Sequence, residues 1–188
     1  MLEYEKKVMV SAEEYTAISA AFCRGIVPKT QTNYYFDNDD LSMNQKGITY
    51  RIRAKDGKYT ATIKSHSARH PDCSVEVDLV EKTKFDPQIF GEFGVHYQGE
   101  LVTERLILYK DSACEMVLDR NVYLGYTDFE LEVEYGKENE ECARQRIENI
   151  ADFLAATEHV PDVEAFLARI GQGSSKSQRF FERLRQRK

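Results

Sequence analysis

The chain of 188 residues contains no tryptophan, and its four cysteines include no C-x-x-C pair. Closely spaced cysteines are typical of zinc sites and redox motifs, so their absence argues against both and favours reduced, structural thiols. The four histidines, His66, His70, His96 and His159, show no H-x-x-x-H or similar spacing. We expect them on the surface or in loops rather than around a metal ion.

Long apolar segments are also missing from the sequence. No run of 18 or more apolar residues occurs and the start does not resemble a signal peptide, so we expect a cytoplasmic protein without a membrane partner. The formal net charge of −6 argues against a general nucleic-acid binder, because such proteins neutralise phosphates with basic residues. The charge is nevertheless uneven, since residues 128–141 are strongly acidic and residues 174–188 are basic.

The composition that remains, 41% hydrophobic and 31% charged, suits one globular domain over residues 1–188. Strands are predicted over residues 2–8, 31–38, 73–80, 99–110, 114–125 and 127–136, and a hairpin over 47–65 has Asp56-Gly57 as its turn signal. Helices are predicted over residues 11–22, 138–159, 162–170 and 176–188, the first opening with the capping-box pair Ser11 and Glu14. The sequence therefore predicts an α+β fold of about eight mostly antiparallel strands with helices near both ends.

The polar faces of these strands are segregated by charge. Glu3, Glu5 and Lys7 share one face of the first strand, and taken alone they fit an ordinary solvated surface. The pattern recurs later in the chain, with Arg51 and Arg53 on one strand face and with Glu130, Glu132 and Glu134 on another. Like charges held close together destabilise a fold unless something offsets them. A divalent cation would offset the glutamates, and a polyanion would offset the arginines.

A barrel with these charged faces turned inward would make the arrangement a binding site. Ligand sets made of carboxylate oxygens favour Mg²⁺ or Mn²⁺ over zinc. Arginine and lysine side chains suit phosphate oxygens, because arginine binds them bidentately and lysine acts as a point charge.

The E-x-E-x-K stretch over Glu3, Glu5 and Lys7 resembles the N-terminal signature of the CYTH domain family, the triphosphate tunnel metalloenzymes. Further matches follow in order along nearly the whole chain: YYFDNDDLSMNQKGITYRIR (residues 34–53), TATIK (60–64), ERL (104–106), VLDRNVYLGYTDFELEVE (117–134) and SKSQRFF (175–181). The last segment departs from the family pattern at Ser177, where an aromatic residue is common.

The resemblance implies an eight-stranded antiparallel β-barrel with flanking helices, whose tunnel binds a triphosphate and a divalent cation, Mg²⁺ or Mn²⁺. It implies substrate binding by Lys7, Arg51, Arg53, Lys64, Arg105, Lys176 and Arg179. It also implies metal binding by Glu3, Glu5, Glu130, Glu132 and Glu134. Glu76 or Asp119 would orient the attacking water, and no serine, cysteine or histidine stands out as a covalent nucleophile.

Several activities are compatible with such a site. We expect a stand-alone metal-dependent triphosphatase that hydrolyses inorganic triphosphate or another small molecule containing a triphosphate. A class IV-type adenylate cyclase, a thiamine triphosphatase and a non-catalytic polyphosphate- or nucleotide-binding module are the alternatives. No tryptophan is available to stack on thiamine. A homodimer is compatible with the sequence, and we expect residues 65–73 to form a solvated connection.

Overall fold

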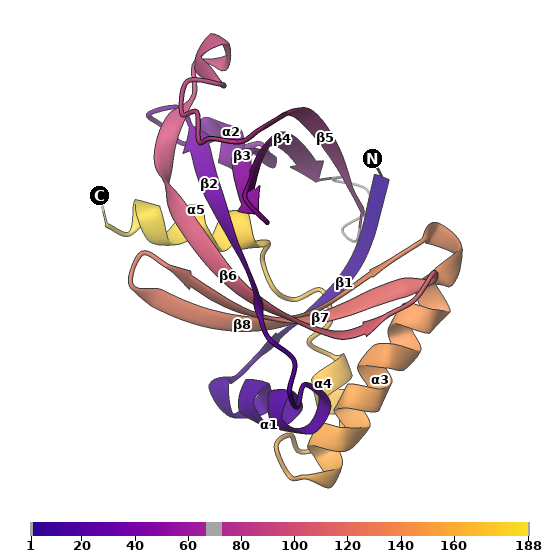
Figure 1. The fold of residues 1–188 in the computed structure, drawn as a ribbon. Coiled ribbons are helices and arrows are strands. Elements are labelled where there is room, and N and C mark those ends of the chain that lie inside the picture. The colour runs from indigo at the N-terminus through magenta and orange to yellow at the C-terminus, as the bar shows by residue number, and fades with distance from the viewer. Residues whose placement is uncertain (1, 67–72, 188) are drawn as a thin grey trace.

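The computed structural model describes residues 2–66 and 73–187, apart from the side chains of Leu2, Glu3, His66 and Cys73. Its centre is an eight-stranded antiparallel barrel, with helices on part of the outer surface (Figure 1). The order around the barrel is β1-β5-β4-β3-β2-β6-β7-β8, so β1 closes the ring between β5 and β8. The predicted fold class is therefore confirmed, whereas the predicted connection at residues 65–73 lies largely outside the described residues.

The strands are β1 (Leu2–Val10), β2 (Lys29–Asp37), β3 (Ile48–Lys55), β4 (Lys58–His66), β5 (Cys73–Lys82), β6 (His96–Lys110), β7 (Cys114–Tyr123) and β8 (Tyr126–Tyr135). The helices are α1 (Ala12–Phe22), α2 (Ser42–Gln45), α3 (Glu140–Ala156), α4 (Val163–Leu167) and α5 (Lys176–Arg185), with short 3₁₀ turns η1 (Gly91–Phe93) and η2 (Lys137–Asn139). The sequence did not predict α2 or the two 3₁₀ turns. Within the described residues, no helix is both long and apolar enough to cross a membrane.

Local sequence signals explain several element boundaries. At the start of α1, the Ser11 hydroxyl accepts a hydrogen bond from the Glu14 amide at 3.1 Å, and the Glu14 carboxylate accepts one from the Ser11 amide at 2.7 Å. This is the predicted capping box. In the β3–β4 turn, Asp56 and Gly57 both adopt positive φ, at 51° and 77°, as a two-residue hairpin turn with favourable twist requires.

The outer surface of the barrel is covered unevenly. Outward-facing side chains of β1, β7 and β8, including Leu131, are fully buried against the helices gathered below the barrel in Figure 1. The outer face of β5 has no such cover, because Val75, Val77 and Leu79 remain 47%, 49% and 43% exposed. The sequence alternation predicted which residues share a face but not which face a helix covers.

Helix α5 lies apart from α1, α3 and α4 in Figure 1 and packs against the barrel beside α2. Its rings Phe180 and Phe181 are fully buried in a cluster that includes three barrel residues: Tyr35, Leu101 and Tyr123. Gly99 permits this packing, because a Cβ at that position would lie 2.8 Å from the ring of Phe180. A second capping box, between Ser175 and Gln178, fixes the start of α5 beside the barrel interior.

Candidate functional site

The barrel encloses a cavity of about 360 Å³ whose lining is strongly charged. Nine cationic side chains line it: Lys7, Lys29, Arg51, Arg53, Lys55, Lys64, Arg105, Lys110 and Lys176. Four carboxylates line it: Glu5, Glu115, Glu132 and Glu134. The charged strand faces thus point into the barrel, and their excess of positive charge suits an anionic ligand.

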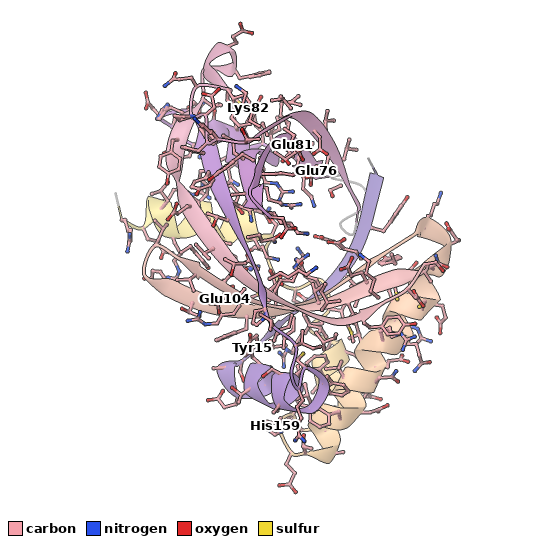
Figure 2. All side chains as sticks on the ribbon, in the orientation of Figure 1. Tyr15, Glu76, Glu81, Lys82, Glu104 and His159 are labelled. Atoms are coloured by element: carbon pink, nitrogen blue, oxygen red, sulfur yellow. The ribbon has the colours of Figure 1, made fainter. Side chains whose placement is uncertain are left out.

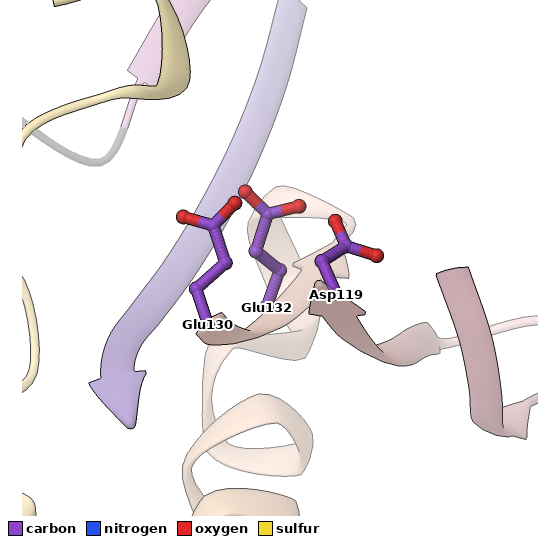
Figure 3. A group of neighbouring side chains, drawn as sticks. All are labelled: Asp119, Glu130 and Glu132. Atoms are coloured by element: carbon purple, nitrogen blue, oxygen red, sulfur yellow. The ribbon is translucent and has the colours of Figure 1, made fainter. Parts of the chain in front are cut away.

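Beside the cavity lies a carboxylate cluster, here called the carboxylate wall. It consists of Asp119 on β7 and Glu130 and Glu132 on β8, and Glu132 is the member that lines the cavity. All three are buried, and each offers a carboxylate oxygen within 4.8 Å of the others (Figure 3). Strand pairing explains the arrangement, because Asp119 lies directly opposite Glu130 in the β7–β8 ladder. A buried set of oxygen donors without sulfur or nitrogen fits Mg²⁺ or Mn²⁺.

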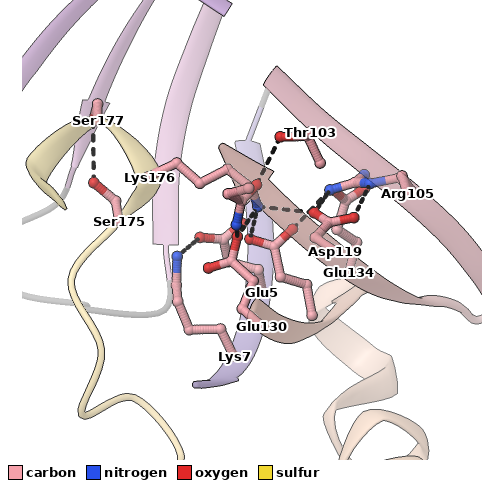
Figure 4. Close-up of polar contacts among 12 residues, drawn as sticks. Glu5, Lys7, Thr103, Arg105, Asp119, Glu130, Glu134, Ser175, Lys176 and Ser177 are labelled. Atoms are coloured by element: carbon pink, nitrogen blue, oxygen red, sulfur yellow. Dashed lines mark hydrogen bonds and ion pairs between the residues drawn. The ribbon is translucent and has the colours of Figure 1, made fainter. Parts of the chain in front are cut away.

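Two cations that line the cavity, Lys176 and Arg105, contact these carboxylates (Figure 4). The Lys176 ammonium lies 3.0 Å from Asp119 and 2.8 Å from Glu132, and it also contacts Glu130. The Arg105 guanidinium lies 2.7 Å from Asp119 and 2.8 Å from Glu132. A divalent cation would therefore compete with Lys176 for the same oxygens.

The protonation states follow from this network. Burial alone would raise the pKa of Glu132, but Lys176, Arg105 and Lys7 together hold it well below its usual value. Burial would lower the pKa of Lys176 and of Arg105, yet the surrounding carboxylates raise both. Glu132, Lys176 and Arg105 are accordingly all charged at neutral pH.

Arg179 supports the carboxylate wall from behind. Its guanidinium donates to Asp128 at 2.8 Å and to Glu130 at 2.9 Å, and it is not among the residues that line the cavity. Burial opposes its charge, but Glu130 and Asp128 raise its pKa. This position suits a residue that orients Glu130 better than one that binds a ligand in the cavity.

The N-terminal strand contributes a pair of opposite charges. Lys7 lies 2.8 Å from Glu5, and both line the cavity. Burial disfavours the charge on Glu5, but Lys7 lowers the pKa of this carboxyl. Lys7 pairs in register with Glu132 on β8, which brings the start of the chain to the carboxylate wall. The side chain of Glu3 is outside the described part of the chain, so its predicted metal-binding role stays a prediction.

The opposite side of the cavity, here called the cationic wall, consists of Lys29 on β2, Arg51, Arg53 and Lys55 on β3, and Lys64 on β4. Among the described residues of these three strands, no carboxylate lines the cavity. The balance of charge on this side is therefore strongly positive.

Glu76 on β5 contacts the inner part of the cationic wall. One terminal nitrogen of Arg51 lies 2.6 Å from each of its two oxygens, and Lys64 lies 3.9 Å from it. Burial opposes the charge on Glu76, but Arg51 lowers its pKa. Glu76 projects from β5 (Figure 2), and β1 and β8 lie between β5 and the strand β7 that carries Asp119, so the two predicted catalytic carboxylates are on separate strands that do not pair.

The outer part of the cationic wall is uncompensated. Arg53 donates one long hydrogen bond, at 3.5 Å, to Asn33, and no carboxylate in the described chain forms an ion pair with it. The neighbouring charge of Arg51, helped by burial, lowers the pKa of Arg53 to about 10. Lys29 and Lys55 are exposed and likewise form no ion pair with any described residue.

The structure adds cavity residues that sequence analysis missed, notably Lys29, Lys55 and Lys110. Lys55 could have been found, because it continues the alternation of Arg51 and Arg53 on β3. Lys110 lies 2.6 Å from Glu115 across the β6–β7 hairpin, a pairing that depends on the fold. Tyr15 and His159, labelled in Figure 2, lie among the helices and not in the cavity.

The protein is thus a closed antiparallel barrel with a charged interior, in which carboxylates gather on one side and cations on the other. A family model described as the CYTH domain matches residues 1–157. The chain belongs to the CYTH domain family, as its sequence motifs predicted.

Known relatives agree with this assignment. A Bacillus subtilis (strain 168) protein named "Putative triphosphatase YjbK" is 30% identical over 147 residues, which is 71% of this chain and 77% of the relative. A Bacillus halodurans structure described as "a putative adenylate cyclase" aligns with a TM-score of 0.66 and 25% identity, over 95% of this chain and 97% of that one. A Hippeastrum structure, described as a "Putative adenylyl cyclase" with "a dominant triphophatase activity", has a TM-score of 0.61 and 18% identity, over 96% and 95% of the chains.

Proposed function

We propose that this protein is a metal-dependent triphosphatase that hydrolyses inorganic triphosphate inside its barrel. The observation that carries the proposal is the division of the cavity into a buried carboxylate wall and a cationic wall with uncompensated charge. Hydrolysis of a phosphoanhydride needs both, because the transition state depends on positioning and on neutralising phosphate oxygens rather than on covalent catalysis.

The cationic wall is the natural place for the phosphate groups. Arg51 and Arg53 present guanidinium groups into the cavity, and Lys64 and Lys7 add point charges. Glu76 holds Arg51 through both carboxylate oxygens, so we assign Glu76 to positioning Arg51 rather than to orienting water. Binding an anion would also relieve the repulsion that lowers the pKa of Arg53.

The donor set of the carboxylate wall fits Mg²⁺ or Mn²⁺. Asp119, Glu130 and Glu132 would hold such an ion, with Glu5 nearby on β1, once the Lys176 ammonium moves out of the cluster. When bound, the ion would polarise phosphoryl oxygens and lower the pKa of a coordinated water. We therefore assign Asp119 to metal binding, whereas Lys176, released from the carboxylates, can reach a phosphate because it lines the cavity.

The reaction balances without a covalent intermediate on the protein. A water oxygen adds to the terminal phosphorus, the bridging P–O bond breaks, and pyrophosphate leaves while a proton passes to solvent. Orthophosphate and pyrophosphate are the products. Arg51 and Arg53 are placed to offset charge on the phosphate oxygens throughout this exchange.

The proposal treats residues 1–188 as one functional domain. Helix α5 lies beyond residues 1–157, which match the family model, yet Lys176 and Ser177 from this helix line the cavity. Ser177 also hydrogen-bonds Thr49 on β3 at 2.9 Å, which ties the helix to the barrel interior. The name of the Bacillus subtilis relative and the activity described for the Hippeastrum protein support a triphosphatase over other functions.

A substrate panel tests the proposal. Phosphate release and cyclic AMP are measured with inorganic triphosphate, ATP and thiamine triphosphate, each with Mg²⁺, Mn²⁺ or excess chelator. We expect the highest kcat/KM for inorganic triphosphate, and no turnover in chelator. Glu132→Gln should lose at least about 100-fold in kcat, whereas Glu164→Gln should match the wild type, because Glu164 is an exposed side chain on α4. Cyclic AMP accumulation from ATP would identify a cyclase, and undiminished hydrolysis in chelator would refute the metal assignment.

A further inference from the structure

The two ends of the barrel differ in what packs against them. Helix α5 packs against the end that contains Tyr35, near the end of β2, and the packing of Phe180 on Gly99 holds it there. Lys29 begins β2 and Lys55 ends β3, so in this antiparallel pair both lie at the opposite end. Both lysines are exposed and both line the cavity, which identifies them with its entrance.

Three cations form a row along β3 toward this entrance. Arg51, Arg53 and Lys55 alternate on the inward face, so their Cα atoms span about 13 Å along the strand. Gln31 on β2 pairs with Lys55 on β3, and Lys29 lies two residues before Gln31 on the same strand. Lys29 therefore lies beside the outer end of the row. The row extends farther than the three phosphate groups of a triphosphate.

The inner and outer parts of the row differ in their partners. Arg51 is held by Glu76, whereas Arg53, Lys55 and Lys29 form no ion pair with any residue that the structure describes. Lys110, also near the entrance, is neutralised by Glu115 at 2.6 Å. The cations without an ion pair among the described residues therefore lie toward the entrance, where Glu115 and Glu134 also line the cavity.

We propose that Lys29 and Lys55 form a subsite that binds phosphate groups beyond the third, so that the protein prefers linear phosphate chains of four or more units. The inference rests on the proposed function and specifies the substrate class of the same site. A chain would insert its terminal phosphates beside Arg51 and Arg53 and leave the following groups at the two lysines. The same lysines repel the cationic thiazolium ring of thiamine triphosphate, which would lie at the entrance if its triphosphate were bound inside.

Direct binding tests the subsite without relying on turnover. The protein in excess chelator is titrated calorimetrically with sodium triphosphate, linear tetraphosphate and thiamine triphosphate. The wild type should bind tetraphosphate about threefold to tenfold more tightly than triphosphate, the range expected for two exposed charge contacts. Thiamine triphosphate should bind more weakly than triphosphate. The advantage of the longer chain should shrink as salt is added, because exposed charges are screened.

Variants isolate the two lysines. The double variant Lys29→Gln/Lys55→Gln should reduce the tetraphosphate advantage to less than about twofold while lowering triphosphate affinity only slightly, and Lys29→Arg/Lys55→Arg should retain it. Lys46→Gln is the matched control, since Lys46 is an exposed lysine that precedes β3 at its other end. Equal affinity of the wild type for both chains, or an undiminished advantage in the glutamine double variant, would overturn the subsite alone. If neither chain binds the wild type in chelator, this inference fails, whereas phosphate release with Mg²⁺ or Mn²⁺ decides the proposed function separately.

Discussion

The carboxylate wall and the cationic wall differ in how their charges are compensated. In the carboxylate wall, Asp119 and Glu132 each contact both Arg105 and Lys176, so the buried charges neutralise one another. In the cationic wall, Arg53 has no such partner among the described residues, and its pKa falls to about 10. The first wall is thus organised without a ligand, whereas the second gains from binding an anion.

The outer surface of the barrel shows a second difference, between β8 and β5. The strands that carry the carboxylate wall are covered by helices, and Leu131 between Glu130 and Glu132 is fully buried. On the other side of the barrel, Val77 on β5 is 49% exposed. Burial on both faces explains why β8 can hold buried carboxylates in fixed positions. Ile52, between Arg51 and Arg53 on β3, is also buried, in a second apolar cluster that includes Phe90. The two walls therefore differ in the pairing of their charges, and β5 is the strand whose outer face stays exposed.

The largest effect on stability should come from removing a cation of the carboxylate wall. Arg105→Met leaves Asp119 and Glu132 short of a buried partner, so the free energy of unfolding should fall by about 3–5 kcal/mol. Arg53→Met, the matched change on the cationic wall, should leave it within about 1 kcal/mol or raise it, because repulsion with Arg51 is relieved. Urea denaturation of the two variants measures both values. Equal losses would mean that Arg53 also belongs to a structural ion pair.

The covered and uncovered outer faces should differ by a similar but smaller amount. Leu131→Ala creates a cavity under the helices and should cost about 2–5 kcal/mol of unfolding free energy. Val77→Ala, on the exposed face of β5, should cost less than about 1 kcal/mol. Thermal unfolding of both proteins provides the comparison. A large loss for Val77→Ala would show that a partner covers β5 in solution.

The pH dependence of stability should arise mainly from the carboxylate wall. The pKa of Glu132 in the folded protein lies well below its usual value of 4.5, so between these values the unfolded state binds more protons. Its contribution is therefore present above about pH 4.5 and is lost as the pH falls further. The melting temperature should drop between about pH 5 and pH 3. Glu132→Gln should show a shallower drop than Glu164→Gln, and identical pH profiles would contradict the assignment.

Much of the barrel follows from local sequence. The Asp56-Gly57 turn predicted the β3–β4 hairpin, the capping box at Ser11 predicted α1, and alternating charges predicted the inward faces of β1, β3 and β8. Alternation also predicted that Arg51 and Arg53 point into the barrel. Side chains of a strand alternate between its two faces, so the charged face of β3 points inward when its apolar face is buried outside.

The rest of the site depends on contacts that local patterns do not contain. Lys176 resembled a phosphate ligand by its motif, yet it lies among carboxylates because α5 packs into the barrel end. Cys114 and Cys142 are separated in the sequence, but their sulfurs lie 3.1 Å apart, as the start of α3 meets β7. The exposure of β5 likewise depends on where the helices pack, which strand alternation does not specify.

The central claim is that the cationic wall binds the triphosphate and the carboxylate wall binds the metal ion. Separate titrations with the anion and with the metal test this claim most directly. Triphosphate in chelator, and Mn²⁺ without triphosphate, are each titrated into wild type, Arg53→Met and Glu132→Gln. Arg53→Met should weaken triphosphate binding tenfold or more, about 1.4 kcal/mol, and leave Mn²⁺ binding within about twofold. Glu132→Gln should show the reverse, with Mn²⁺ binding lost and triphosphate binding retained. Equal loss of both ligands in both variants would contradict two separate walls and indicate a single, inseparable site.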